Sequence, residues 1–160
     1  MSILMKPIPL YSLVIIPSLE QSNLVKHYKE LLKNNIGWFN SANSAAHITI
    51  INFDNEVMLT LYFEQIREFC KTLVPQEVTL DTFDSFGDKT FFIAPNETSQ
   101  HYLKQIIADL HKHLDFKIKN THAHLSIARG LDSAKMKTAY KVFKTIDVYL
   151  RFNCDAFYLR

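Results

Sequence analysis

The sequence predicts an α/β (α+β) fold in which two pseudo-symmetric lobes, built from a duplicated β-α-β-α-β unit, enclose a central cleft. Two observations support this prediction. Residues 46–50 (AHITI) return 77 positions later as residues 123–127 (AHLSI), and the predicted strands and helices follow one another in the same order around each copy. We therefore expect a single bilobal domain over residues 1–160, with lobe motifs at 47–50 and 124–127.

The first half of the chain has the periodicity of three strands and two helices. An apolar run closed by Pro17 is typical of a central strand, and the 3.6-residue spacing after it indicates a helix. Gly37 with several Asn and Ser residues marks a loop, and Pro75 ends the second helix. The predicted elements are a strand at 11–16, a helix at 18–32, a loop at 34–46, the first motif strand, a helix at 54–73 and a strand at 77–83.

The second half repeats this order. Residues 85–88 (SFGD) are expected to form a tight turn between two strands. Asp132 or Ser133 can cap the last helix. The predicted elements are a strand at 89–94, a helix at 98–114, the second motif strand at 122–128, a helix at 132–143 and a closing strand at 148–159.

The composition is that of a globular protein. Hydrophobic residues make up 48% of the chain and aromatic residues 12%, with three Gly and five Pro, which argues against a disordered or fibrous protein. The formal charge of +2 allows an anionic ligand without indicating a protein that coats nucleic acid. No apolar run is long enough for a membrane segment, and Cys70 and Cys154 lack metal-ligand spacing. We expect a cytoplasmic monomer with two buried free thiols.

Each motif combines an imidazole and a hydroxyl on one face of a strand. Because side chains alternate along a strand, His47 and Thr49 share a face while their apolar neighbours point into the core. The same alternation places His124 with Ser126. If the duplicated halves face each other across a pseudo-two-fold axis, all four side chains meet in one cleft.

This combination suits a phosphodiester. Two imidazoles across a cleft can act together near neutral pH, one taking a proton from an attacking nucleophile and the other protonating the leaving oxygen. The hydroxyls of Thr49 and Ser126 and the guanidinium of Arg129 can donate hydrogen bonds to the non-bridging phosphate oxygens.

The two motifs, HITI at 47–50 and HLSI at 124–127, resemble the paired H-x-[ST]-x motifs of the 2H (two-histidine) phosphoesterase superfamily. That superfamily includes 2'-5' RNA ligase-like proteins and RNA 2',3'-cyclic phosphodiesterases, and the resemblance covers nearly the whole chain. Arg129 matches a position that is commonly Arg in the cyclic phosphodiesterase branch. The resemblance implies a bilobal fold with an open cleft and hydrolysis of a cyclic or 2'-5' phosphodiester without a metal or other cofactor.

The expected function is therefore hydrolysis of a 2',3'-cyclic phosphate on RNA ends or a related nucleotide, with His124 as base and His47 as acid. Three alternatives stay open. The substrate can instead be a 2'-5' linked oligonucleotide or a cyclic phosphate on ADP-ribose, and the chain can be a non-catalytic nucleotide-binding module. It can also be a metal-dependent hydrolase centred on His122 and His124, although no carboxylate lies within either motif.

Three further residues are candidates for the substrate site. Trp38, in the loop before the first motif, and Phe53, six residues after His47, can stack on a nucleobase, although aromatic residues also suit a core. His122 should share a face with His124, where it can line the cleft or support that histidine.

Overall fold

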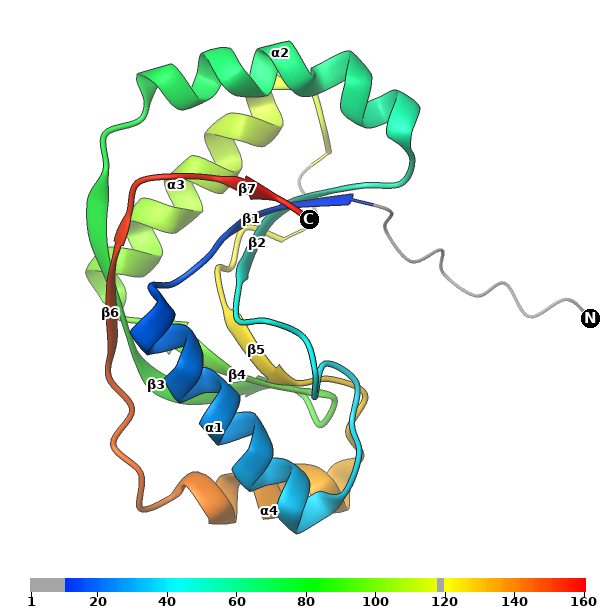
Figure 1. Cartoon of the computed structure of the whole chain (residues 1–160), viewed down its shortest axis with the longest axis vertical. Coiled ribbons are helices and arrows are strands. Elements are labelled where there is room, and N and C mark those ends of the chain that lie inside the picture. The colour runs from blue at the N-terminus through cyan, green and yellow to red at the C-terminus, as the bar shows by residue number, and fades with distance from the viewer. Residues whose placement is uncertain (1–10, 118–119) are drawn as a thin grey trace, which may run out of the picture.

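The computed structural model describes residues 11–117 and 120–160, and these residues form four helices and seven strands (Figure 1). None of the helices in these ranges is both long enough and apolar enough to cross a lipid bilayer. The elements are β1 (Tyr11–Ile15), α1 (Leu19–Ile36), β2 (Ile48–Phe53), α2 (Glu56–Thr72), β3 (Gln76–Phe86), β4 (Thr90–Pro95), α3 (Glu97–His113), β5 (Leu125–Ala128), α4 (Ser133–Phe143), β6 (Leu150–Cys154) and β7 (Tyr158–Leu159).

The strands form one sheet in the order β6-β3-β4-β5-β2-β1-β7. All of its pairings are antiparallel, so the α+β form of the predicted fold class is confirmed. The two motif strands, β2 and β5, are neighbours at the centre of the sheet. This places the repeated sequences side by side.

The predicted duplication is confirmed, and its two halves are interleaved. The order β1-α1-β2-α2-β3 returns as β4-α3-β5-α4-β6. The third strand of the first half pairs with the first strand of the second half (β3 with β4), and β7, at the end of the second half, pairs with β1. The helices are also paired across the two halves, because α1 packs against α4 and α2 packs against α3 (Figure 1). Each pair of packed helices therefore contains one helix from each half.

Several predicted boundaries differ from the structure, and the second motif strand, predicted at 122–128, begins only at Leu125, so that His47 and His124 each lie one residue before their strands. Helix α1 continues to Ile36 before Gly37, whose φ of 78° suits glycine, ends it. Strand β3 extends through Phe86, because that residue pairs with Thr90. The centroid of its ring lies 4.3 Å from that of the Phe92 ring. The predicted closing strand is interrupted at 155–157, so that β6 pairs with β3 and β7 pairs with β1.

The prediction that Phe53 stacks on a ligand is wrong. Its side chain is 0% exposed and packs edge-on against Phe116, with 6.1 Å between ring centroids. Simple alternation would place Phe53 on the same face as Thr49. The pairing of β2 with β1 slips by one residue at Ile50, and such a bulge turns the following side chains to the other face.

Replacing Phe53 by Ala should lower the free energy of unfolding by about 3–5 kcal/mol, because it removes a fully buried ring. Urea denaturation measures this change. Phe63→Ala is the matched control, since Phe63 on α2 is 46% exposed. A Phe53 variant no less stable than the Phe63 variant would contradict the burial of this ring.

Candidate active site

The register of the two motif strands brings the four predicted side chains together. Ile48 of β2 pairs with Leu125 of β5, and both are fully buried. In an antiparallel pair, the positions on either side of this contact also lie opposite each other, on the face of the sheet away from those two core residues. Each histidine therefore lies opposite the hydroxyl residue of the other motif. Extending this register by one residue sets His47, just before β2, opposite Ser126, and sets His124, just before β5, opposite Thr49.

Two buried apolar residues flank these pairs. Val14 of β1 pairs with Thr49, and Phe92 of β4 pairs with Ser126. Both are at most 1% exposed, yet neither belongs to the main core cluster. The four motif side chains thus lie between two apolar positions that occupy equivalent strands of the two halves.

Both histidines are held by the same backbone contact. The Nδ1 atom of His47 lies 2.7 Å from the carbonyl oxygen of Ala45, and that of His124 lies 3.0 Å from the carbonyl oxygen of His122. A carbonyl oxygen only accepts, so we assign the ring proton to Nδ1 in each case. The Nε2 atom of each neutral imidazole is then left as an acceptor.

The surroundings of His124 are aromatic. The ring of Phe86 meets it edge-on at 4.9 Å between centroids, and the ring of Phe92 lies at 5.2 Å. Phe86 is only partly buried, so part of its surface is open beside the histidine. The sequence does not identify Phe86 as a residue of the site, because residues 85–88 are predicted to form a turn.

The surroundings of His47 are cationic. The Nη1 atom of Arg160 lies 2.7 Å from His47 Nδ1, and both Nη atoms lie 3.4 Å from the Ser44 hydroxyl. Lys29 of α1 is buried, and its Nζ donates to the carbonyl oxygens of Ser41 at 3.0 Å and Ser44 at 2.8 Å. It thereby fixes the loop that leads to His47.

Sequence reasoning missed both Lys29 and Arg160. For Lys29 a signal was present: it lies on the apolar stripe of α1 with Val25, Tyr28 and Leu32, which are all buried. A lysine on such a stripe needs internal acceptors. For Arg160 the sequence gives no comparable signal, since its contact depends on the pairing of β7 with β1.

The electrostatic environment favours the neutral form of each histidine. Burial, followed by the charges of Arg160, Lys29 and Arg129, lowers the pKa of His47 to about 4 against the opposing effect of the Ala45 hydrogen bond. Burial also lowers the pKa of His124, with smaller contributions from His122 and Arg129. Cations thus act on His47 more than on His124.

Arg129 is anchored by its backbone, because its amide nitrogen donates to Asn40 at 3.1 Å. Its side chain is exposed, and its charge acts on both histidines. Trp38 is 59% exposed in the segment before Asn40, and Lys33 lies over its ring at 5.7 Å. In the described part of the chain, Trp38 makes no aromatic or side-chain hydrogen-bond contact with a motif residue.

His122 supports His124 through its backbone carbonyl. Its own side chain is exposed, with Nδ1 3.0 Å from Gln100 Nε2. The same glutamine bonds both backbone polar groups of Ala123 and so anchors the entry to the second motif. Over residues 11–117 and 120–160, no three His, Cys, Asp or Glu side chains are grouped so as to hold a metal ion.

Comparison with known proteins identifies the family. A family model described as the 2'-5' RNA ligase superfamily matches residues 17–160. A solved structure of Usb1 from Kluyveromyces marxianus has a TM-score of 0.57 and 13% identity, covering 94% of this chain and 92% of that one. At this identity the likeness concerns the fold alone. A search of curated proteins by sequence gave no match.

The chain belongs to the 2'-5' RNA ligase superfamily, which confirms the resemblance to the 2H phosphoesterases inferred from the paired motifs. Membership supports an activity of the phosphoesterase type.

The buried amine of Lys29 predicts a specific dependence of stability on pH. Burial, followed by the charges of Arg129 and Arg160, lowers its pKa from 10.5 to about 8. Between these values the unfolded chain binds more protons than the folded one, so this group makes the protein more stable as the pH rises. From pH 8 to 9.5 the free energy of unfolding of the wild type should gain about 1–2 kcal/mol over that of Lys29→Met.

Urea denaturation of both proteins at a series of pH values measures this difference. Lys26→Met, at an exposed position of the same helix, is the matched control and should follow the wild type. A constant difference between wild type and Lys29→Met across this range would show that Lys29 keeps an ordinary pKa.

Proposed function

We propose that this chain, acting as a single domain, hydrolyses a 2',3'-cyclic phosphate on RNA ends or a related nucleotide, with His47 and His124 as the acid–base pair and no metal ion. The proposal is supported above all by one observation, the same backbone hydrogen bond at both histidines. Each donates Nδ1–H to the carbonyl oxygen two residues before it, so that Nε2 is the working atom of both. The antiparallel register of β2 and β5 supports a position for both histidines on one face of the sheet, since each lies one residue before its strand.

In this mechanism the base accepts a proton from water as the water oxygen attacks phosphorus. The bond from phosphorus to one ribose oxygen breaks, and the acid gives its proton to that oxygen. The product is a phosphomonoester, and the two histidines have exchanged protonation states. Thr49, Ser126 and Arg129 donate to the non-bridging oxygens, where negative charge accumulates.

The electrostatics favour His47 as the base and His124 as the acid, the reverse of the assignment expected from sequence. The base must be neutral before the reaction. Burial lowers the pKa of both histidines, and His47 has in addition the charges of Arg160 and Lys29, which disfavour its protonation.

The first test is hydrolysis of nucleoside and oligoribonucleotide 2',3'-cyclic phosphates in excess EDTA. Loss of either acid–base group typically lowers the rate about 10²–10⁴-fold, so His47→Ala and His124→Ala should each lose activity on this scale. His27→Ala, at an exposed position of α1, is the matched control and should retain it. A folded His47 or His124 variant with wild-type activity would contradict the mechanism, and loss of wild-type activity in EDTA would indicate a metal.

The roles of the two histidines are separated by a substrate with a good leaving group. In a nucleoside 4-nitrophenyl phosphate the phenolate departs without protonation, so the acid is dispensable and the base is not. The fold loss of activity in His124→Ala should therefore be about tenfold smaller on this substrate than on the cyclic phosphate. In His47→Ala the fold loss should be the same on both substrates. The opposite pattern would restore His124 as the base.

A further inference from the structure

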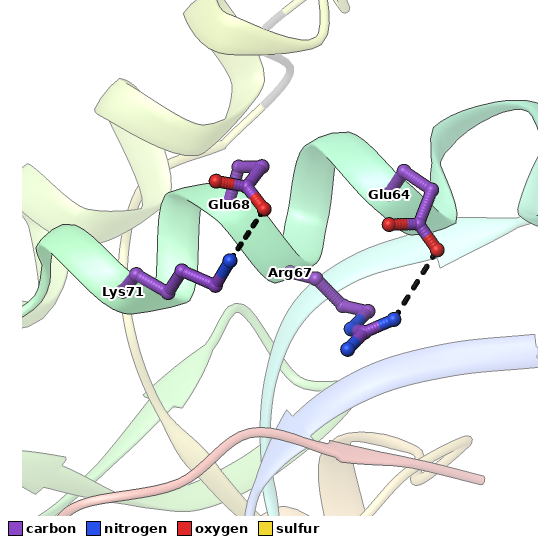
Figure 2. Close-up of polar contacts among 4 residues, drawn as sticks. All are labelled: Glu64, Arg67, Glu68 and Lys71. Carbon is purple, nitrogen blue, oxygen red and sulfur yellow. Dashed lines mark hydrogen bonds and ion pairs between the residues drawn. The ribbon is translucent and has the colours of Figure 1, made fainter.

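Among the described residues, no Asp or Glu side chain forms an ion pair with the cations around His47. On the exposed surface of α2, Arg67 pairs with Glu64 and Lys71 pairs with Glu68 (Figure 2). The other two ion pairs among the described residues involve Lys89 and Arg151. All 16 Asp and Glu side chains of the sequence lie within the described ranges. None of them forms an ion pair with Lys29, Arg129 or Arg160.

These positive groups are also close together. Ser44 links two of them, because its carbonyl oxygen accepts from Lys29 while its hydroxyl lies 3.4 Å from both Nη atoms of Arg160. Lys29 is only 3% exposed, and its amine donates to two backbone carbonyl oxygens. Several positive charges without an Asp or Glu ion-pair partner repel one another, and a bound anion relieves that repulsion.

Arg160 in particular has donors to spare. A guanidinium carries five N–H groups. Its contact at 2.7 Å is with His47 Nδ1, and that atom cannot accept from Arg160 while it donates to Ala45. The Ser44 hydroxyl is then its remaining side-chain acceptor. Because Nδ1 and Nε2 lie on different edges of the imidazole, Arg160 stands beside His47 but away from the atom proposed to meet the scissile phosphate.

We infer that Arg160, backed by the buried amine of Lys29, forms a second anion subsite that receives an additional phosphate of the substrate. This inference rests on the proposed function, and it narrows the substrate class to nucleotides with a further phosphate near the scissile one, such as an RNA end. An anion at this position also offsets the charges that disfavour protonation of His47. The second phosphate thereby makes His47 a stronger base.

The test is calorimetric binding of two product-like probes, uridine 3'-monophosphate and uridine 3',5'-bisphosphate. The wild type should bind the bisphosphate at least about tenfold more tightly, as expected for one added charge-assisted contact. Arg160→Gln should abolish this preference. Arg67→Gln, which changes a guanidinium that already has a carboxylate partner, should keep it.

Similar affinities of the wild type for the two probes, including no binding of either, would overturn the inference. So would a bisphosphate preference that survives in Arg160→Gln. Because binding needs no turnover, a protein that prefers the bisphosphate but hydrolyses no cyclic phosphate would support the subsite while contradicting the proposed reaction.

Discussion

The pairing of Ile48 with Leu125 is the contact on which the site depends. It joins the two motif strands in antiparallel register, and side-chain alternation then decides what lies on each face. A slip of either strand by one residue would turn its histidine toward the core and its buried aliphatic side chain outward. The burial of these two residues and the position of the imidazoles are therefore consequences of a single register.

The duplicated fold provides two equivalent histidines, and their surroundings make them different. Phe86 and Phe92 lie against His124, whereas Lys29 and Arg160 lie around His47. An acid–base reaction needs one group that holds a proton and one that accepts it. Unequal electrostatics on a symmetric backbone provide such a difference without changing the hydrogen bond that orients either ring.

The sequence predicted the features that depend on local pattern. The order of elements and the motif strands follow from side-chain periodicity, and the family match agrees with the paired motifs. Features that depend on the pairing of distant segments could not be predicted from the sequence. The burial of Phe53 follows from a bulge in β2, and the position of Arg160 follows from the pairing of β7 with β1. The pairing of α1 with α4 and of α2 with α3 likewise depends on packing, which the periodicity of the sequence does not indicate.

In the proposed site, one phosphate is held between the Nε2 atoms of His47 and His124. Long-range ¹H–¹⁵N NMR spectra of the imidazoles, recorded while uridine 3'-monophosphate is added, test it most directly, because ¹⁵N shifts report the protonation state of each ring nitrogen. Nε2 of both residues should shift along one saturable binding curve, while His27 should not shift. A ligand that saturates the protein and moves only one of the two histidines, or neither, would contradict it.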